Sequence, residues 1–501
     1  MNYNSTVQLD NWSATHPDRP AITFEDRELS YFELNKLVNA SANCLASYGI
    51  GRGDRVAILG MNSDEYVIAC LAISRIGAVS VLLNYRLALE ELKYLIDDSE
   101  PVALLVDSDF LGIVKELEKD IAVLRLSCIL YSDQKCDDSL SALRAPFVGE
   151  NAEIAHLNED SIERILYTSG TTSRPKGVML SHGNSWWNLV TQILVGCNSP
   201  DEKTLVFAPL YHIGAQELPG MRVFGVGGQM VVMRRFDAES VLQAVSTFSI
   251  TGMVMVSTMV HIMRDLPNRL LYDTSSLNWL VFGQVPENML DDIRAIFPNA
   301  SLKNSYGLTE SCSTVTTIDK RNQRLFPTSP GKAIACFDLK IVDENGNENL
   351  RGDLGEIVVR GPKTMLGYWR NPSATAETIR DGWLHTGDVG YLDENDLLYV
   401  VDRKKDMIRT GGENVASQEI ERVIYELDWV AEVAVVGVAD EKWGERIRAV
   451  VVPREGATPS QEELVRHCKE KLASFKVPKE VIFRAELPRN PSGKVLKRDL
   501  K

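Results

Sequence analysis

The chain lacks the excess of positive charge that nucleic-acid-binding proteins carry. Its 54 lysine and arginine residues stand against 69 aspartate and glutamate residues, for a formal net charge of −15. That balance argues against a nucleic-acid partner, since a polyphosphate backbone requires a net basic face. Any anionic ligand must therefore be held by local cations.

Clustered cysteines and long uninterrupted hydrophobic runs are also missing. The eight cysteines are scattered, with no C-x-x-C pair and no cluster with histidine, so we expect reduced, mostly buried thiols in a cytoplasmic protein. The polar residues 1–15 carry Asp10 and do not resemble a signal peptide. The most apolar long window, residues 66–85, contains Arg75 and Gly77. It predicts a helix followed by a buried strand, and no transmembrane segment.

What the chain does have is length and a regular alternation of elements. Its 501 residues exceed what one compact core usually holds, so we expect at least two domains. From about residue 21 to 360, strand-like runs alternate with amphipathic helical stretches, which predicts an α/β fold with helices packed on mostly parallel sheets. A small antiparallel, barrel-like unit is expected next. After a charged segment, residues 402–406, the pattern predicts a small α+β domain.

A glycine-lysine loop, residues 168–177, follows the apolar run 165–167 and gathers hydroxyl residues, glycine and Lys176. Backbone N–H groups, hydroxyls and an ammonium can converge there on phosphate oxygens. The loop is not a Walker A motif, which needs glycine before the lysine and serine or threonine after it, where this chain has Pro175 and Gly177. It therefore predicts a phosphate site outside the P-loop class, with a plain surface turn as the alternative.

Six further motifs follow this loop in order. They are Pro209-Leu210-Tyr211-His212, Tyr306-Gly307-Leu308-Thr309-Glu310, Gly382-Trp383-Leu384-His385-Thr386-Gly387-Asp388, Asp402-Arg403-Lys404-Lys405-Asp406, Gly411-Gly412-Glu413-Asn414-Val415 and Pro491-Ser492-Gly493-Lys494. Together the seven motifs resemble those of the acyl-adenylate-forming enzymes, the superfamily of acyl-CoA synthetases, firefly-type luciferases and peptide-synthetase adenylation domains. The resemblance covers essentially the whole chain, and seven collinear matches make chance agreement negligible.

The resemblance implies an ATP-dependent carboxylic acid–CoA ligase. Such an enzyme activates a carboxylate as acyl-AMP with release of pyrophosphate, then transfers the acyl group to CoA and releases AMP. The expected cofactors are ATP, Mg²⁺ and coenzyme A, and the expected partner is a small-molecule carboxylic acid. Because one anion must approach another, catalysis has to consist largely of charge neutralisation and alignment.

The resemblance also implies which residues hold the phosphates. Glu310 is expected to bind Mg²⁺, with an ordinary surface glutamate as the alternative, and Thr309 to reach the α-phosphate. His212 is a further catalytic candidate. The β- and γ-phosphates are expected to contact the loop residues Thr168, Ser169, Gly170, Thr171, Thr172 and Lys176.

The nucleoside is expected to contact other motifs. A carboxylate such as Asp388 can accept hydrogen bonds from both ribose hydroxyls, and Arg403 can donate to the same sugar, although an ordinary salt bridge between the two is the alternative. By resemblance, adenine lies near the tyrosine of the Tyr306-Gly307 motif, the two residues before it, and a separate segment of three residues. These positions are Tyr306, preceded by Asn304 and Ser305, and the segment Gly283, Gln284 and Val285.

The second half-reaction is expected to use the C-terminal domain. Lys494 is implied to bridge the acyl carboxylate and the α-phosphate in the first step. Rotation about a hinge at 402–406, with Lys405 as the pivot, would then remove Lys494 from the site and bring in a face that carries Gly411, Gly412 and Glu413. The two glycines allow the close backbone approach that a narrow pantetheine tunnel requires. We therefore expect an adenylation domain over residues 1–401 and a small mobile C-terminal domain over 407–501.

The acid itself is less closely constrained. Gln284 replaces a glycine at the acyl-pocket wall and Asn304-Ser305 replaces the usual Gln-Gly, departures that resemble the carnitine and crotonobetaine CoA-ligase branch more than the fatty-acyl branch. They favour a short or polar acid. A trimethylammonium acid would need an aromatic surround, for which plain core packing is the alternative. The aromatic candidates are Trp186, Trp187, Tyr211 and Phe282.

Two other functions fit less well. A ligase that loads a carrier-protein phosphopantetheine is one, but peptide-synthetase domains place an aspartate near Pro-Leu-Tyr-His to hold an amino group, and none lies between Ala208 and Pro219. A non-catalytic nucleotide-binding sensor is the other, which the presence of Lys176, Glu310 and Lys494 disfavours. A homodimer and a peripheral membrane contact stay open.

Overall fold

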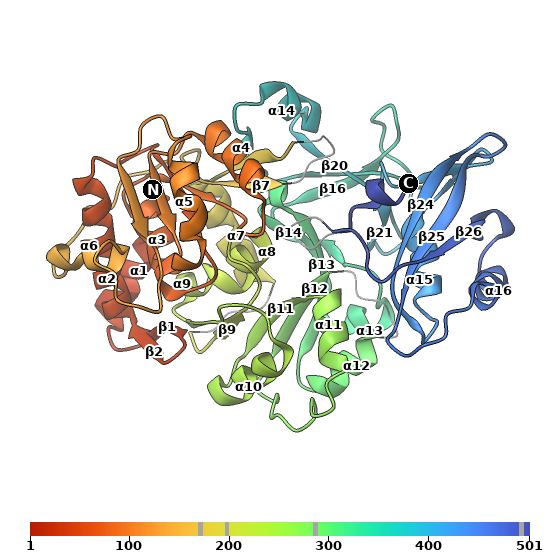
Figure 1. The fold of residues 1–501 in the computed structure, drawn as a ribbon, viewed down its shortest axis with the longest axis horizontal. Coiled ribbons are helices and arrows are strands. Elements are labelled where there is room, and N and C mark those ends of the chain that lie inside the picture. The colour runs from red at the N-terminus through yellow and green to blue at the C-terminus, as the bar shows by residue number, and fades with distance from the viewer. Residues whose placement is uncertain (169–173, 196–199, 284–288, 490–494) are drawn as a thin grey trace. The chain divides into compact units, whose positions relative to one another are not determined.

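The computed structural model describes residues 1–168, 174–195, 200–283, 289–489 and 495–501 (Figure 1). The chain divides into two compact units. The larger unit consists of Met1–Asp338 and Val359–Leu384, and the smaller unit consists of Leu339–Val358 and His385–Lys501. The domain boundaries expected at 401 and 407, with a hinge between them, stay predictions.

The larger unit contains a seven-stranded sheet in the order β18-β8-β7-β4-β3-β5-β6. Its central strands are parallel, while β8 runs antiparallel to β7 and β18 antiparallel to β8. The apolar strands β3, β4 and β5 are buried on both faces, as parallel strands between helices must be. The bounds are β3 (Arg55–Leu59), β4 (Val79–Leu82), β5 (Ala103–Val106), β6 (Leu126–Ile129), β7 (Ile162–Thr168), β8 (Lys176–Ser181) and β18 (Gly367–Tyr368).

A nine-stranded sheet, in the order β15-β14-β13-β12-β11-β9-β10-β1-β2, completes the larger unit. It is parallel from β13 to β1 and antiparallel at both edges. The predicted α/β class with mostly parallel sheets is confirmed. The bounds are β1 (Pro20–Phe24), β2 (Arg27–Ser30), β9 (Lys203–Val206), β10 (Gln229–Val232), β11 (Gly252–Val256), β12 (Trp279–Gly283), β13 (Ser301–Leu308), β14 (Ser313–Thr317) and β15 (Lys332–Ala333).

Helices cover these sheets, as Figure 1 shows for α11 and α12 beside β11 and β12. Several begin at serine N-caps; the Ser30 hydroxyl accepts from Glu33 N and the Ser63 hydroxyl from Tyr66 N. The helices are α1 (Val7–Thr15), α2 (Tyr31–Ser47), α3 (Asp64–Arg75), α4 (Leu89–Ser99), α5 (Leu111–Glu118), α6 (Leu140–Leu143), α7 (His182–Leu194), α8 (Ile213–Ala215), α9 (Val223–Val226), α10 (Ala238–Phe248), α11 (Ser257–Arg264), α12 (Leu290–Ile296), α13 (Lys320–Leu325) and α14 (Pro372–Thr378). Shorter turns are η1 (Ser108–Phe110), η2 (Ala145–Phe147), η3 (Gln216–Gly220) and η5 (Thr309–Ser311).

The apolar window 66–85 folds as predicted, into most of α3 followed by β4. All of α3 is buried, and the Arg75 guanidinium that interrupts its apolar pattern is bonded to Asp10 and Asn39. Across the described ranges, none of the helices combines the length and apolarity needed to cross a lipid bilayer. Five of the described cysteines, Cys44, Cys70, Cys128, Cys312 and Cys468, are buried free thiols.

The smaller unit holds most of a sheet in the order β16-β17-β20-β19, with β21 antiparallel to β20. Strand β21 runs through Asp402 to Arg403, so the charged segment does not end it. Asp402 is buried because its carboxylate accepts from the backbone N and the hydroxyl of Ser417 at 2.6 and 2.5 Å. The bounds are β16 (Asp338–Val342), β17 (Gly355–Arg360), β19 (Ile379–Arg380), β20 (Trp383–Leu392) and β21 (Leu398–Arg403).

The C-terminal part is an α+β fold, as predicted. Strand β24 alternates strictly: Val433 and Val435 pack beneath the helices, whereas Ala434 and Val436 face a second cluster with Leu487 and Leu500. The elements are β22 (Ile408–Thr410), β23 (Glu413–Val415), α15 (Ser417–Ile424), β24 (Val430–Asp440), β25 (Gly444–Pro453), α16 (Gln461–Lys471), η6 (Ser474–Lys476), β26 (Glu480–Phe483) and η7 (Lys497–Leu500).

Candidate active site

The predicted phosphate loop begins at the end of β7 and returns to the chain's described part shortly before β8. The two strands are antiparallel, and Thr168 pairs with Lys176 where the hairpin ends. This register places Thr168, which carries a hydroxyl, directly beside Lys176, which carries an ammonium. The other predicted phosphate ligands, Ser169, Gly170, Thr171 and Thr172, lie outside the described residues.

Lys176 and Glu310, far apart in the chain, meet through a tyrosine that the sequence analysis missed. Strand β18 pairs with β8 and places the ring of Tyr368 under the Lys176 ammonium, with Nζ 5.0 Å from the ring centroid. The Tyr368 hydroxyl donates to Glu310 Oε1 at 3.0 Å. We call these three residues the Lys176 cluster. The one local signal for Tyr368 is an aromatic pair directly after Gly367.

A tight turn, η5, presents Glu310 and its neighbour Thr309. The Ser311 hydroxyl accepts from the backbone N of Leu308 at 3.1 Å and donates to Ser313 O at 2.9 Å, which closes the turn on itself. The preceding glycine is required here, because a Cβ on Gly307 would lie 2.0 Å from Ser313 O. The backbone of Glu310 is therefore held independently of its side chain.

The predicted adenine residues lie on neighbouring parallel strands. Asn304, Ser305 and Tyr306 belong to β13, and Gly283 ends β12. Asn304 is buried, donates to Thr328 O at 3.2 Å, and pairs in register with Phe282. Gln284 and Val285 are not among the described residues.

The four aromatic side chains proposed as a cation surround enter different contacts. Phe282 is part of the core of the nine-stranded sheet. Tyr211 meets Tyr85 edge to face at 5.4 Å, and Trp186 meets Tyr3 in the same way at 6.5 Å. For Phe282, the alternative of plain core packing therefore holds. Trp187 lies half-buried on α7.

His212 precedes the short helix α8 as its N-cap residue. Its Nδ1 atom accepts from Gly214 N at 3.3 Å, and its own backbone N donates to Pro209 O. This contact fixes the ring at the start of a helix while its other nitrogen faces away from the cap. Because Nδ1 accepts this hydrogen bond, the neutral His212 ring carries its proton on Nε2.

In the smaller unit, Asp388 and Arg403 face each other across β20 and β21. They are register partners, and Arg403 Nε lies 2.8 Å from Asp388 Oδ1. We call these two residues the Asp388 pair. Asp388 is 5% exposed, and the turn before it is shaped by Gly387, whose φ is +72°. An ordinary salt bridge thus exists, and the ribose role of both residues stays a prediction.

A second acidic residue, Glu356, lies beside that turn and was also missed. Its carboxylate accepts from Gly387 N at 3.2 Å and pairs with Lys404 and His385 at 3.3 and 3.4 Å. Burial raises the pKa of Glu356, but the charge of Lys404 and the contact with His385 outweigh it and hold the pKa below its usual value. Glu356 therefore anchors the motif that carries the Asp388 pair.

The residues predicted for the thiol step are on the surface of the smaller unit. Lys405 and Glu413 are exposed, and Gly411 and Gly412 have φ of +61° and +87° between β22 and β23. A Cβ on Gly411 would lie 3.2 Å from the ring of Trp443, so the backbone passes close to an exposed indole. Lys494 falls outside the described residues.

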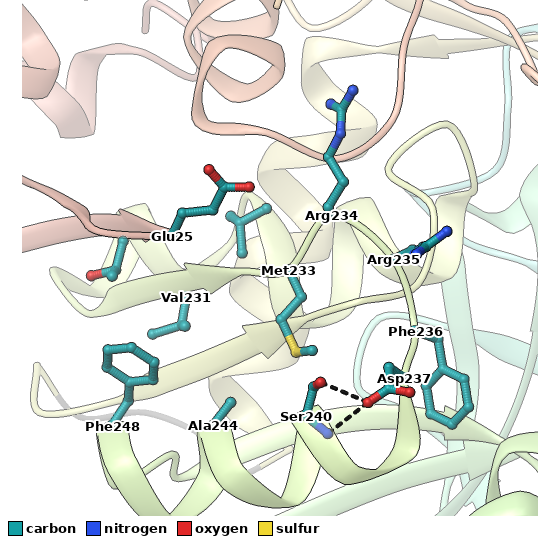
Figure 2. A pocket seen from close by; sticks show the side chains of 12 residues that line it. Glu25, Val231, Met233, Arg234, Arg235, Phe236, Asp237, Ser240, Ala244 and Phe248 are labelled. Atoms are coloured by element: carbon teal, nitrogen blue, oxygen red, sulfur yellow. Dashed lines mark hydrogen bonds between the residues drawn. The ribbon is translucent and has the colours of Figure 1, made fainter. Parts of the chain in front are cut away.

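The larger unit contains a pocket of about 650 Å³, lined by β1, β10, α10 and the segment before α10; Figure 2 shows the side chains that line it. None of the predicted site residues lines it. Its polar groups largely bond to protein partners: Asp237 accepts from Ser240, and Arg234 pairs with Asp107 and Asp109. This pocket is separate from the Lys176 cluster in its lining residues.

Family models account for most of the chain. Residues 9–369 match the AMP-binding enzyme model, and residues 419–494 match the AMP-binding enzyme C-terminal domain. The chain belongs to the AMP-binding enzyme family. The expected membership in the acyl-adenylate-forming superfamily is confirmed.

Other members of the AMP-binding enzyme family resemble the chain over nearly its full length. The 2-succinylbenzoate–CoA ligase of Bacillus cereus is 37% identical over 97% of this chain and 95% of its own. The indoleacetate–CoA ligase of Aromatoleum aromaticum is 35% identical over 99% and 98%. The particular resemblance to the carnitine and crotonobetaine branch stays a prediction.

Solved structures of AMP-binding enzymes agree with the fold. ATP-bound MatB from Rhodopseudomonas palustris superposes with a TM-score of 0.92 at 32% identity, covering 100% of this chain and 98% of its own. The o-succinylbenzoate CoA synthetase of Bacillus subtilis, in complex with its acyl-adenylate intermediate, gives a TM-score of 0.88 at 32% identity, with coverage of 99% and 97%.

Proposed function

We propose that this protein is an ATP-dependent carboxylic acid–CoA ligase whose acid carries an aromatic ring. The observation that carries the ligase assignment is the Lys176 cluster, which joins the hairpin of the phosphate loop to Glu310 in a member of the AMP-binding enzyme family. The aromatic acid is supported by relatives named for 2-succinylbenzoate and indoleacetate, each 35% or more identical over nearly the whole chain.

The first half-reaction forms acyl-AMP. A carboxylate oxygen of the acid attacks the α-phosphorus of ATP, the bond to the bridging oxygen breaks, and pyrophosphate leaves. Lys176 and the Thr168 hydroxyl bind the β- and γ-phosphates, and Thr309 contacts the α-phosphate. Lys494 neutralises the carboxylate and the α-phosphate together. The protein thereby lowers the repulsion between two anions and holds them in line.

Glu310 fits the role of a magnesium ligand. Mg²⁺ prefers hard oxygen donors and, in nucleotide sites, takes one or two carboxylates with substrate phosphates and water. Glu310 offers such a carboxylate, oriented by the Tyr368 hydroxyl at one oxygen, and Thr309 adds a hydroxyl in the same turn. When bound, Mg²⁺ supplies charge neutralisation at the leaving pyrophosphate. Tyr368 orients the carboxylate that holds the ion.

The second half-reaction moves the acyl group to CoA. The thiol sulfur attacks the acyl carbon, the thiol proton passes to solvent, and the bond from the acyl carbon to the phosphate oxygen breaks, so that AMP leaves. Asp388 accepts hydrogen bonds from the ribose hydroxyls and Arg403 donates to the same sugar. Segment 402–406 serves as a hinge between the domains 1–401 and 407–501, with Lys405 as its pivot, and Gly411, Gly412 and Glu413 line the approach of the thiol.

Pyrophosphate release across a panel of acids tests this function. The panel contains 2-succinylbenzoate, indoleacetate, cinnamates, crotonobetaine, carnitine and fatty acids of three lengths, each with ATP and Mg²⁺, with and without CoA. We expect CoA-dependent multiple turnover with an aromatic acid, and its loss in Lys494→Ala. Turnover confined to carnitine-like or fatty acids would refute the aromatic class. Release of about one equivalent even with CoA would point to a different acyl acceptor.

A further inference from the structure

A fully buried lysine, Lys363, lies between Glu310 and Tyr368 in the sequence. None of the predicted site roles explains it. Lys363 is 0% exposed, and its Nζ donates to Asn188 Oδ1 on α7 at 2.8 Å and to Thr314 O on β14 at 2.7 Å. Burial of an ammonium is costly unless hydrogen bonds and charges compensate it. The burial of this ammonium in the protein interior therefore requires a physical explanation.

Lys363 belongs to a segment, residues 361–369, that we call the strap. Asn184 on α7 donates through Nδ2 to the carbonyls of Pro362 and Thr364 at 2.9 and 3.0 Å. Further along, Met365 N donates to Glu310 O at 2.8 Å. The strap is thus bonded to α7 on both sides of Lys363 and, one residue further along, to the turn of Glu310.

The strap also reaches the phosphate-loop hairpin. Leu366 N donates to Met179 O at 3.0 Å, and Trp369 N donates to Gly177 O at 2.7 Å, next to Lys176. Tyr368 lies between these two bonds and donates to the Glu310 carboxylate. A shift of the strap would therefore move both contacts of Glu310, its backbone bond and its side-chain bond, relative to Lys176.

A network of buried charged side chains also connects Lys363 to the hairpin of β7 and β8. Asn188, which accepts from Lys363, donates to Glu217 Oε2 at 2.8 Å. Glu217 is paired with Arg164, and Arg164 is also paired with Glu163. Arg164 and Glu163 are both on β7, the strand that ends at Thr168. Burial lowers the pKa of Lys363 to about 8, although nearby Cys312 and Glu217 favour the charged form. The ammonium thus joins a network that runs from β7 to the strap.

We infer that Lys363 is a positioning residue for the magnesium–ATP step: it fixes the strap against α7 and β14 and thereby sets Glu310 and Tyr368 opposite Lys176. The inference rests on the proposed function of Glu310. Residues that orient a metal ligand from behind typically change metal affinity or activity by about 10- to 100-fold when removed. Lys363 touches neither nucleotide nor acid in this role, and the second half-reaction, which needs no pyrophosphate site, does not depend on it.

The test compares Lys363→Met with the wild-type enzyme in three measurements. Titration calorimetry gives the affinity for ATP at several Mg²⁺ concentrations, without turnover. Stopped-flow assays give the rate of acyl-AMP formation and, separately, the rate of thioester formation from supplied acyl-AMP and CoA. We expect the variant to bind ATP with Mg²⁺ and to form acyl-AMP at least roughly tenfold less well, with thioester formation changed less than twofold.

A matched control removes a buried cation elsewhere in the larger unit. Arg144 is 3% exposed and forms a bidentate pair with Glu65 at 2.5 and 2.6 Å. Arg144→Met should lower the unfolding temperature as Lys363→Met does, but leave the Mg²⁺ dependence of ATP binding unchanged. If both variants lose both half-reactions equally, Lys363 is only a stabilising residue and the inference is wrong. Unchanged Mg²⁺ dependence in Lys363→Met would overturn it as well.

If Lys363→Met does not fold, Asn188→Leu tests the same link, because it removes one of the two acceptors of the lysine and keeps the number and branching of the side-chain heavy atoms. The same selective loss of magnesium-dependent ATP binding is then expected, and its absence would contradict the inference. Failure of the proposed function gives a different result, because the wild-type enzyme would then form no thioester from any supplied acyl-AMP. Calorimetry would still compare the Mg²⁺ dependence of ATP binding between wild type and Lys363→Met.

Discussion

The Lys176 cluster and the Asp388 pair reach similar short distances by opposite routes. The three residues of the cluster come from β8, η5 and β18, which are far apart in the sequence, and a buried network and the strap hold them together. The two residues of the pair are register partners on adjacent strands of one antiparallel ladder. The cluster therefore depends on tertiary packing, whereas the pair needs one local hairpin.

This difference separates what each region can tolerate. A change beneath the cluster is transmitted to Glu310 through backbone bonds, because the strap has bonds on both sides of Lys363. A change near the pair acts on a local hairpin, whose turn is stabilised by Glu356 through Gly387. We therefore expect distant substitutions to affect the cluster more than the pair.

The largest effect is expected from Glu310→Gln, which keeps the shape of the side chain and removes its charge. Loss of the carboxylate that we assign to Mg²⁺ should lower the rate of acyl-AMP formation on the order of 100- to 1000-fold. The measurement is single-turnover formation of acyl-AMP at saturating ATP. Glu100→Gln, which removes a carboxylate exposed on the same unit and paired with Arg370, should have no effect; equal losses would contradict the assignment.

Asp388→Asn should act on nucleotide binding and not on chemistry. Hydrogen bonds to a charged group contribute about 1.5–3 kcal/mol, so KM for ATP should rise roughly 10- to 100-fold with a small change in kcat. Steady-state kinetics at saturating acid and CoA measure both constants. Asp396→Asn, which alters an exposed pair with Arg351 in the same unit, is the control. A variant with normal KM would reduce the Asp388 pair to an ordinary salt bridge.

Tyr368→Phe sharpens the description of the cluster. It keeps the ring beneath Lys176 and removes the hydroxyl that donates to Glu310, so we expect roughly a fivefold increase in the Mg²⁺ concentration needed for half-maximal activity, from about 1 kcal/mol for one hydrogen bond. Tyr272→Phe is a closely matched control, because the Tyr272 hydroxyl also donates to a glutamate, Glu239, at 2.6 Å. A shift of equal size in both variants would mean that the Tyr368 contact is not specific.

The smallest effect is a pH dependence of stability. The pKa of Lys363 is about 8 in the folded protein and 10.5 for an ordinary lysine, so between these values the unfolded chain binds more protons and stability rises with pH. Thermal unfolding of wild type and Lys363→Met from pH 7.5 to 10 should show the wild type gaining a few degrees relative to the variant. A constant difference would indicate that the Lys363 pKa is not lowered.

Much of the fold could be predicted because its signals are local. The break at Arg75 and Gly77 separates α3 from β4, and the apolar residues of β24 form a strand buried on both faces. The charged residue Asp402 continues β21 because Ser417, fifteen residues later, satisfies its carboxylate. The partner of a buried charge is not visible in a local pattern.

The candidate site divides in the same way. The family resemblance of the motifs predicted Lys176, Glu310, Asp388 and Arg403 as site residues, and the structure brings them into two groups. Tyr368 could not be predicted, because its role depends on β18 pairing with β8 across almost two hundred residues. The strap and the network around Lys363 were missed for the same reason: only the folded chain brings α7, β14 and the strap together.

The most direct test of the central claim is acid-dependent exchange of labelled pyrophosphate into ATP in the absence of CoA. An enzyme that forms acyl-AMP reversibly must incorporate the label when a substrate acid is present, and the exchange rate must fall on the order of 100- to 1000-fold when Glu310 is changed to glutamine. We predict exchange with an aromatic acid and none without acid. Hydrolysis of ATP to ADP and phosphate, with no exchange under any acid, would contradict the account.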